Sequence, residues 1–285
     1  MSALAPGEAT AVAGGAAQAS ALAPFVDFQN VWLAYGPEQA ARHEFAVEDI
    51  TLTAQPGEFI AIVGPSGCGK STFMKLATGL KRATRGTVRI DGQTLAGPTR
   101  LVGMAFQAPT LLPWRSTLDN VLLPLEIVEP WRSEMKRRRA EFAARARGLL
   151  AKVGLQGYED LPPWQLSGGM QQRASICRAL IHEPRMLLLD EPFGALDAFT
   201  REELWCMLRD LWTERRFNVI LVTHDLREAA FLADTVYVMS KRPGRIVARR
   251  PIDLPRPREL EITYTAGFTD LVHELRGHIG QVRNT

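Results

Sequence analysis

The chain has 285 residues, of which 46% are hydrophobic and 23% are charged, so it can bury one large domain or a domain with a subdomain. Its 34 Lys and Arg residues nearly balance its 31 Asp and Glu residues, a composition that does not favour nucleic-acid binding. No apolar run approaches the roughly 20 residues of a membrane-spanning helix, so we expect another chain to supply any membrane part.

The N-terminal segment, residues 1–24, is rich in Ala, Gly, Ser and Pro, and Glu8 is its only charged residue. It has neither the basic start and long apolar run of a signal peptide nor the arginines of a transit peptide. We therefore expect a disordered tail. Strand-like patterns follow over residues 25–36 and 48–54.

A phosphate-binding motif comes directly after residues 59–63, an apolar run that predicts a strand buried on both faces. The motif reads GPSGCGKST and matches G-x-x-x-x-G-K-[ST] of nucleotide triphosphatases, and the residues after it predict a helix. Glycines let backbone N–H groups approach phosphates, and the helix presents its positive dipole end to the same anion. The motif assigns Lys70 to the outer phosphates and Ser71 to magnesium; a merely tight turn would not require Lys-Ser. The candidate phosphate-binding residues are Gly64, Pro65, Ser66, Gly67, Cys68, Gly69, Lys70, Ser71 and Thr72.

Two side chains near this motif leave alternatives open. Tyr35 ends a predicted strand, where an aromatic ring either packs in the core or stacks on a nucleotide base. Cys68 lies in an anion-binding loop before a helix, which favours a lowered thiol pKa, but it also fits as a small residue at a variable position. Together with Cys177 and Cys206 it gives an odd number of cysteines without metal-ligand spacing, which fits a reducing cytosol and indicates no disulfide framework or zinc site.

The middle of the chain predicts a hairpin, a strand and a basic helix. Residues 85–95 read RGTVRIDGQTL, with Asp-Gly as the turn signal. Residues 101–106 predict an apolar strand, and the polar Gln107 follows it. Residues 133–154 have a helical and strongly basic pattern, in which the run at 136–139 is either a solvated face or a patch for lipid headgroups or nucleic acid.

A second cluster of serine and glycine precedes a helix. Residues 166–171 read LSGGMQ and lead into the helical pattern QQRASICRALI. The start of this helix provides a second anion site in the same chain. Alternatively, Ser167 is an ordinary N-cap and the glycines are only permissive.

Two more apolar strands end in polar side chains. Residues 185–192 read RMLLLDEP and contain Asp190 and Glu191, while residues 218–224 read NVILVTH and end at His224. Consecutive side chains of an extended strand point in opposite directions, so one carboxylate can hold the magnesium shell while the other faces an attacking water. By itself His224 fits a structural role. Three predicted strands in turn, however, carry phosphate ligands, carboxylates and a histidine at their C-terminal ends, where parallel α/β sheets place their sites.

The end of the chain contains a connector and a helix. Residues 241–260 are rich in Pro and Arg and predict an extended connector, which could also lie near anionic lipid. Phe268, Leu271, Val272 and Leu275 mark a last amphipathic helix, which we expect to pack against the main domain.

The ordered set of a phosphate loop, Gln107, LSGGMQQR, LLLDEP, GALD and THD resembles the nucleotide-binding subunit of an ATP-binding cassette transporter. The resemblance covers about residues 25–245 and implies an α/β fold. It implies a P-loop NTPase core with a mixed or parallel sheet, an antiparallel β subdomain and an inserted α-helical signature subdomain at about residues 110–182. Residues 1–24 would be the tail, and residues 246–285 the connector and C-terminal helix.

The resemblance also implies roles for individual residues and the cofactors ATP and Mg²⁺. Ser167, Gly168 and Gly169 contact the ATP that is bound by the opposite subunit, although Met170 replaces the commonest glutamine of this signature. The remaining implied roles are adenine stacking for Tyr35, phosphate binding for residues 64–72 including the catalytic Lys70, metal binding for Ser71, Gln107 and Asp190, γ-phosphate sensing for Gln107 and His224, and general base catalysis for Glu191.

These features imply a mechanism with partners. Two cassettes close head to tail on two ATP molecules, and the loop after Gln107 receives a short cytoplasmic helix of a membrane permease. The stretches AFQAPTLLPWRSTLDNV and VYVMSKRPGRIV resemble the importer branch for nitrate, sulfonates, taurine and related molecules, including pyrimidine-type precursors. We therefore expect a homodimeric ATPase, peripheral on the cytoplasmic face of the inner membrane, with an extracytoplasmic solute-binding protein and no nucleic-acid partner.

Two other function classes fit the sequence less well. A soluble cassette ATPase of DNA repair or of ribosomes would need a long coiled coil or two cassettes in one chain, and this chain has one of each motif. A P-loop kinase would have no reason to carry LSGGM. Because the ATPase of an importer does not touch the solute, the sequence does not name the solute.

Overall fold

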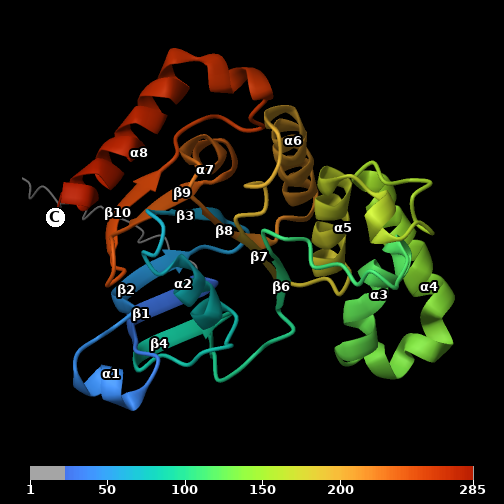
Figure 1. Cartoon of the computed structure of the whole chain (residues 1–285), viewed down its shortest axis with the longest axis horizontal. Helices are drawn as coiled ribbons and strands as arrows, with labels where there is room; N and C mark the ends of the chain where they lie inside the picture. Colours follow the sequence, from blue (N-terminus) through green and yellow to red (C-terminus); the bar gives the residue numbers. More distant parts are fainter. Residues whose placement is uncertain (1–22, 285) are drawn as a thin grey trace, which may run out of the picture.

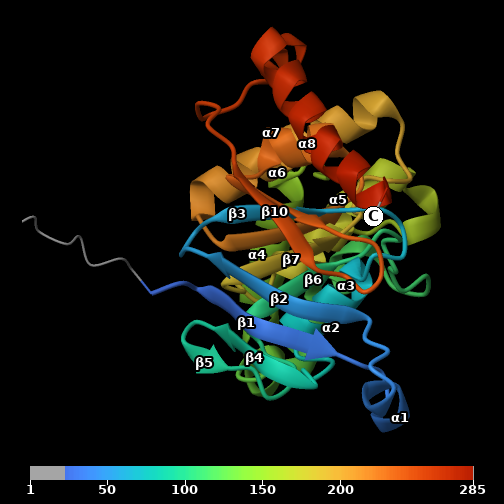
Figure 2. The same ribbon diagram turned by 90° about the vertical axis from the view of Figure 1, so that its left-hand side faces the viewer.

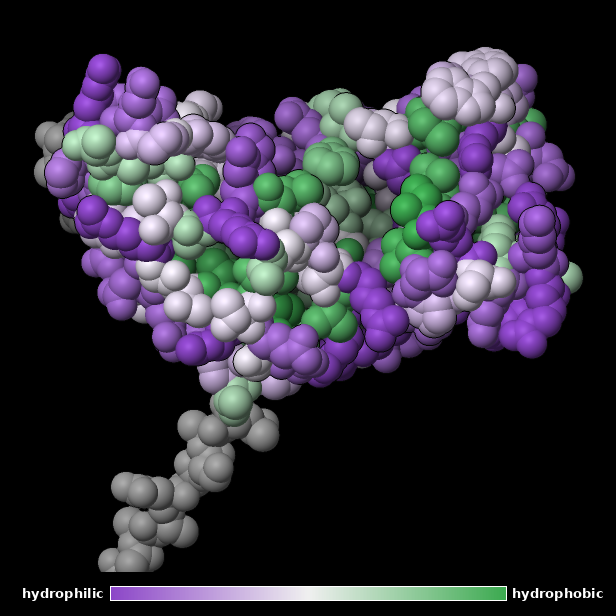
Figure 3. Space-filling model, turned by 90° about the horizontal axis from the view of Figure 1, so that it is seen from below, coloured by the Kyte–Doolittle hydropathy of each residue, from purple (hydrophilic) through white to green (hydrophobic). Residues whose placement is uncertain are grey.

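The computed structural model of the protein describes residues 23–284, with side chains through residue 280. The predicted tail, residues 1–24, lies outside the described residues except for its last two positions. Two sheets stack face to face, helices cover the far face of the larger sheet, and a helical lobe projects to one side (Figures 1 and 2). Seen from below, the two lobes are separated by a notch, and hydrophilic residues cover much of this face (Figure 3).

The smaller sheet is antiparallel and has the strand order β2-β1-β4-β5. Its strands are β1 (Val26–Leu33), β2 (Val47–Ala54), β4 (Arg85–Ile90) and β5 (Gln93–Thr94), and a short helix, α1 (Pro37–Ala41), links the first two. The predicted Asp-Gly hairpin is confirmed: Asp91 and Gly92 have φ values of 52° and 74°, as a two-residue turn between twisted strands requires.

The larger sheet has the order β10-β9-β3-β8-β7-β6 and is mixed, because only β10 runs antiparallel to its neighbour. Its strands are β3 (Phe59–Val63), β6 (Val102–Ala105), β7 (Met186–Asp190), β8 (Asn218–Thr223), β9 (Thr235–Met239) and β10 (Ile246–Pro251). Every residue of β3 and β8 is buried, as their continuous apolar runs predict. The adjacent strands β3, β8 and β7 run parallel, so their C-terminal ends lie at one edge of the sheet. The predicted mixed α/β fold is confirmed.

Two hydrophobic clusters lie on opposite faces of the larger sheet, because successive side chains of a strand point to opposite sides. Phe59, Ala61 and Val63 of β3 belong to the cluster on the face covered by helices. Ile60 and Ile62 belong to the cluster between the two sheets, where helix α2 (Lys70–Ala77) also packs. The strand that precedes the phosphate-binding motif is thus fixed from both sides.

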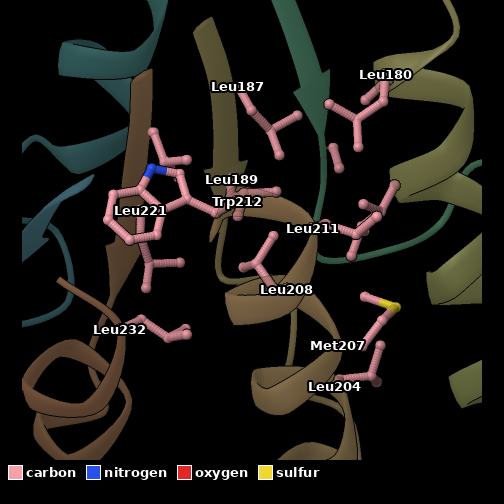
Figure 4. Packing of buried hydrophobic residues seen from close by; sticks show 14 of the residues in the cluster. Leu180, Leu187, Leu189, Leu204, Met207, Leu208, Leu211, Trp212, Leu221 and Leu232 are labelled. Carbon is pink, nitrogen blue, oxygen red and sulfur yellow. The ribbon is translucent and has the colours of Figure 1, made fainter. Parts of the chain in front are cut away.

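Helix α6 (Ala198–Arg215) contributes six buried side chains to the first cluster (Figure 4). Leu208, Leu211 and Trp212 belong to the same buried cluster as Leu187 and Leu189 of β7, and Figure 4 labels all five. Leu208 is fully buried, and the Trp212 ring meets the Phe59 ring edge-on at a centroid distance of 5.9 Å. At about 25 cal/mol per Å² of apolar area, such side chains supply much of the free energy that holds the helix on the sheet.

The helical lobe contains α3 (Thr117–Ile127), α4 (Trp131–Lys152), a 3-10 turn η1 (Pro163–Gln165) and α5 (Gly168–Leu180) (Figure 1). Helix α4 is the predicted basic helix, and it begins two residues earlier than the pattern indicated. Arg138 pairs with Glu134 and Glu141, and Arg139 Nη2 lies 3.0 Å from Asp119 Oδ1. These pairs on an exposed helix favour the solvated face over a headgroup or nucleic-acid patch.

The last part of the chain returns to the larger sheet and covers it. Helix α7 (Leu226–Leu232) follows β8, and β10 pairs with β9 inside the stretch predicted as a connector, so the predicted division at residue 245 falls within one sheet. After the turn η2 (Leu260–Tyr264), helix α8 (Ala266–Asn284) packs its predicted apolar face, with Phe268 and Leu275 buried. Within residues 23–284, no helix is long and apolar enough to cross a bilayer.

Candidate functional site

The phosphate-binding loop joins the end of β3 to the start of α2 and needs glycine at two close approaches. Gly69 is the N-cap of α2 with φ 105°, and a methyl group added there would lie 2.8 Å from Val47 Cγ1. A methyl group on Gly64 would lie 2.9 Å from the Met239 carbonyl oxygen. The backbone therefore turns tightly and leaves the first N–H groups of α2 facing the loop interior.

Lys70 is 7% exposed and reaches back over this loop. Its Nζ donates to the carbonyl oxygens of Gly64 at 2.9 Å and Pro65 at 3.2 Å, and it lies 3.9 Å from Glu191 Oε1. A buried ammonium group needs such partners, and phosphate oxygens would offer stronger ones than neutral carbonyls. The charge is therefore held in place at the loop before any ligand arrives.

A cavity of about 280 Å³ lies between this loop and the end of β7. Six of the nine predicted phosphate-binding residues and both predicted carboxylates line it together, although the two groups are more than 100 positions apart in the sequence. The lining residues are Ser66, Gly67, Gly69, Lys70, Ser71, Thr72, Asp190 and Glu191.

The two carboxylates do not alternate along a strand as we expected. Asp190 is the last residue of β7, but Glu191 lies beyond it with φ 46°, a left-handed conformation that is uncommon for a residue with a side chain. The Glu191 N–H donates to the Val222 carbonyl oxygen at 2.8 Å, which fixes this turn against β8. Burial, and then the neighbouring Glu191 charge, raises the pKa of Asp190.

Glu191 faces the predicted histidine. His224 Nδ1 lies 3.1 Å from Glu191 Oε2, and the His224 side chain is 60% exposed on its other side. Gly194 lies beside both: a methyl group added there would sit 3.9 Å from His224 Cε1 and 3.5 Å from Gln107 Nε2. The ends of β7, β8 and β6 therefore bring Glu191, His224 and Gln107 close to one another.

The serine and glycine cluster lies elsewhere in this chain. Ser167 is the N-cap of α5, and its Oγ accepts from the Met170 N–H at 3.3 Å. Ser167 and Gly168 are exposed, whereas Gly169 is buried against Thr200. Among the described residues, none of these three lines the phosphate-loop cavity.

Comparisons with known proteins agree with this geometry. The family described as ABC transporter matches residues 47–194. The aliphatic sulfonates import ATP-binding protein SsuB of Bacillus licheniformis is 43% identical over 212 residues, covering 74% of this chain and 79% of that protein.

The chain belongs to the ABC transporter family.

Further relatives agree. The taurine import ATP-binding protein TauB of Pseudomonas aeruginosa is 44% identical over 232 residues, covering 81% of this chain and 83% of that protein. A solved dimeric ATP-binding cassette in a post-hydrolysis state, bound to ADP and Pi, is 29% identical, with a TM-score of 0.63 over 81% of this chain and 100% of that chain. The protein is therefore an ATP-binding subunit with ATPase activity, as the sequence analysis predicts.

Two side chains that left alternatives open have defined surroundings in this ABC ATPase. Tyr35 is 44% exposed, so it is not a core residue, and its hydroxyl lies 2.9 Å from Thr72 Oγ1 on α2. Cys68 is 1% exposed, and burial raises the pKa of its thiol, so the lowered pKa that its loop position favoured is wrong. The small-residue interpretation of Cys68 agrees with a side chain packed under the loop.

The sequence analysis missed the residues of α5 that hold the Gln107 loop. Gln172 is 2% exposed, and its Nε2 donates to the Phe106 carbonyl oxygen at 3.1 Å. Arg178 Nη2 donates to the Pro109 carbonyl oxygen at 2.7 Å, and Nη1 donates to that of Thr110 at 2.9 Å. No signal in the sequence separates them from the other polar residues of this helix, such as Gln171 and Arg173.

A second missed group connects the GALD turn with the His224 loop. Arg201 Nη2 donates to the Leu196 carbonyl oxygen at 3.0 Å, and its Nη1 lies 3.3 Å from Asp225 Oδ2. Behind them, the Thr223 hydroxyl donates to Glu228 Oε2 at 3.0 Å and accepts from the Asp225 N–H at 3.0 Å. These hydrogen bonds tie the loop that carries His224 to the first turn of α6.

Proposed function

We propose that this ATPase powers import of a small anionic solute of the sulfonate or taurine class through a partner membrane permease. The relatives named above are import subunits for aliphatic sulfonates and taurine, and they match this chain over most of its length. The observation that carries the chemistry is the 3.1 Å contact between Glu191 and His224 beside the phosphate-loop cavity. In-line attack of water on a terminal phosphate needs a group that orients or deprotonates the water, and we assign this role to Glu191, held by His224.

In the proposed reaction, Glu191 Oε1 or Oε2 takes a proton from the attacking water. His224 holds Glu191 through Nδ1 and contacts the γ-phosphate with its exposed edge. Lys70 leaves the carbonyl oxygens of Gly64 and Pro65 and binds the outer phosphate oxygens, where it stabilises the charge of the transition state. The N–H groups of residues 66–72 hold the remaining phosphate oxygens, and Tyr35 stacks on the adenine.

The residues present fit a magnesium ion. Ser71 and Asp190 line the same cavity, and the Gln107 side chain, which follows β6, lies near Gly194 and not in the lining of this cavity. All three offer oxygen ligands, which Mg²⁺ prefers, and substrate phosphates complete such a shell. Bound there, the ion would neutralise charge on the β- and γ-phosphates.

In this proposal the ATP held in the phosphate-loop cavity also contacts a second copy of the chain. Ser167 and Gly168 are exposed at the start of α5, and the second copy supplies Ser167, Gly168 and Gly169 to the ATP bound by the first. The dimeric state of the related solved cassette supports this arrangement. Two copies closing on two ATP molecules and reopening after hydrolysis would drive the permease between its two conformations.

The proposed setting is peripheral attachment at the cytoplasmic face of the inner membrane. The permease docks a short helix on the loop after Gln107, and an extracytoplasmic binding protein delivers the solute.

The division of the chain is also a proposal: an ATPase domain at residues 25–245, its helical part at about 110–182, and a connector with C-terminal helix at 246–285. A pyrimidine-type precursor as solute, or a soluble non-transport role, would be decided by whether a permease co-purifies and which solute stimulates its ATPase.

Substitution of the proposed general base tests the function. Glu191→Gln keeps the side-chain volume but cannot accept the proton, so we expect ATP to bind while turnover falls about a hundredfold or more. Glu38→Gln, on exposed α1, is the matched control and should hydrolyse ATP at the wild-type rate. Turnover of Glu191→Gln near that of wild type would remove Glu191 from this role.

A further inference from the structure

An exposed aromatic residue follows the GALD turn. Phe199 lies in the first turn of α6 and is 83% exposed, the largest exposed fraction of any large hydrophobic side chain among the described residues. Glu202, one turn further along, has no ion pair within residues 23–280. Single exposed apolar side chains are common on protein surfaces, but here Phe199 and the unpaired carboxylate of Glu202 lie one helical turn apart on the same helix.

Phe199 and Glu202 form a ridge at the start of α6. Its position in a dimer follows from twofold symmetry, so this step rests on the proposed function. If the signature of each copy meets the phosphate loop of the other, the symmetry axis passes between the two regions of one copy. The GALD turn spans that space: Gly194 lies beside Glu191 and His224, and Leu196 Cδ2 would lie 3.8 Å from a methyl group on Gly168. Phe199 follows this turn directly and so lies near the axis.

A cavity of complementary character opens beside the His224 loop. It has a volume of about 480 Å³ and lies between the His224 loop and helix α8. Leu226, Val272 and Ile279 give it apolar walls, and Arg227 and Arg276 add positive charge. Arg201, which belongs to the same turn as Phe199, bonds to Asp225 at the border of this cavity.

The charges match across the axis. Arg276 has no ion pair among the described residues, and Arg227 contacts the Phe268 ring at 5.9 Å without a carboxylate partner. The ridge offers the opposite charge on Glu202. The opposite charges favour a contact between the ridge of one copy and the cavity of the other, and a twofold axis would make that contact twice.

We infer that Phe199 of one copy inserts into the cavity between α7 and α8 of the second copy, where Glu202 pairs with Arg276. Each dimer contains this contact twice. The C-terminal helix, which lies outside the segment matched by the family, thereby becomes part of the interface between cassettes. Insertion also places an aromatic ring beside the His224 loop of the second copy, so closure and the arrangement of the catalytic histidine are linked.

Charge exchange tests the inference in the Glu191→Gln protein, which accumulates the ATP-bound state. Sedimentation with ATP and magnesium gives the dissociation constant of the dimer. We expect Phe199→Ala, Glu202→Arg and Arg276→Glu each to raise it about tenfold or more, and the double variant Glu202→Arg/Arg276→Glu to return it to within about threefold of the parent. Ile127→Ala, which removes another exposed apolar side chain on α3, should leave it unchanged.

The outcomes separate this inference from the proposed function. Rescue by the double variant would support the pairing and would exclude misfolding as the cause of the single effects. If the parent dimerises with ATP but the single variants dimerise equally well, the insertion is wrong and the two-cassette proposal stands. If the parent stays monomeric with ATP, both are overturned.

Discussion

Two helices of this protein begin with glycine and serine at an anion-binding end, yet only one forms a complete site. At α2, a cavity of about 280 Å³ is surrounded by the loop, Lys70 and the two carboxylates at the end of β7. At α5, Ser167 caps its own helix and faces solvent. The N-terminus of α2 therefore lies in an enclosed cavity, whereas that of α5 is open to solvent and forms only half of a site. Charged side chains of neighbouring elements surround only the first.

The largest effect should come from removing the positive charge of Lys70 from the complete site. Lys70→Ala deletes the ammonium group that is placed to bind the outer phosphates, so we expect ATP turnover to fall about a hundredfold to a thousandfold. Steady-state phosphate release measures it. Lys136→Ala, on the exposed face of α4, is the control and should keep wild-type turnover. Equal turnover of both variants would show that the first site is not the one that hydrolyses ATP.

Blocking the exposed start of α5, which we call the half-site, should separate ATP binding from dimerisation. Ser167→Arg adds a long cation to an exposed helix start, so we expect the monomer to bind ATP as before while dimerisation driven by ATP is lost. Fluorescent nucleotide titration and light scattering measure the two properties. Ser133→Arg, on α4, serves as a matched control. Unchanged dimerisation of Ser167→Arg would mean that this helix end binds nothing in the second copy.

A smaller effect should come from the link between the two regions. Gln172 belongs to the helix of the half-site but holds the loop that carries Gln107 of the complete site. Gln172→Leu should lower stability by about 1 kcal/mol through the lost hydrogen bond and should lower kcat about tenfold, because Gln107 moves. The exposed neighbour Gln165→Leu is the control. Loss of stability with unchanged kcat would make Gln172 purely structural.

The smallest effect concerns the buried layer behind the complete site. Burial, and then the charge of Asp225, raises the pKa of Glu228 well above its usual value, while Thr223 and Arg201 oppose the shift and Glu191 adds to it. Folding stability should therefore fall as the pH rises from the unfolded pKa of about 4.3 through the folded pKa.

Replacement of this carboxyl group by an amide removes the titration. Glu228→Gln should be more stable than wild type at neutral pH and equally stable below about pH 4, where the glutamate is protonated in both states. Thermal unfolding between pH 4 and 8 is the measurement. Parallel curves for the two proteins would contradict the buried-acid interpretation.

Much of the complete site could be predicted from the sequence because its parts are local. The strand at 59–63, the glycine loop and the start of α2 adjoin each other in the chain, and the apolar runs before Asp190 and His224 predict strands directly. Each needs only the residues next to it to define its structure. The sequence also contained the motif of the half-site, LSGGM, but it did not show that this helix start is exposed to solvent.

Contacts between distant residues could not be predicted. Arg258 illustrates this: it belongs to a Pro- and Arg-rich stretch that predicts a solvated connector, yet it is 1% exposed. Its guanidinium donates to the carbonyl oxygens of Ala230, Phe231 and Ala233 at the end of α7. Composition favours exposure for arginine, and only the packing of the C-terminal segment on α7 provides acceptors that permit burial.

The sequence by itself determined the family, the order of the strands along the chain and the residue types of the ATPase site, because motifs and apolar runs are written in neighbouring residues. The tertiary structure decided which residues meet. It placed β7 beside β8, turned Glu191 into a left-handed conformation, and so brought its carboxylate 3.1 Å from His224. Such distances depend on how strands pair and helices pack across more than 30 positions, and no local pattern encodes them.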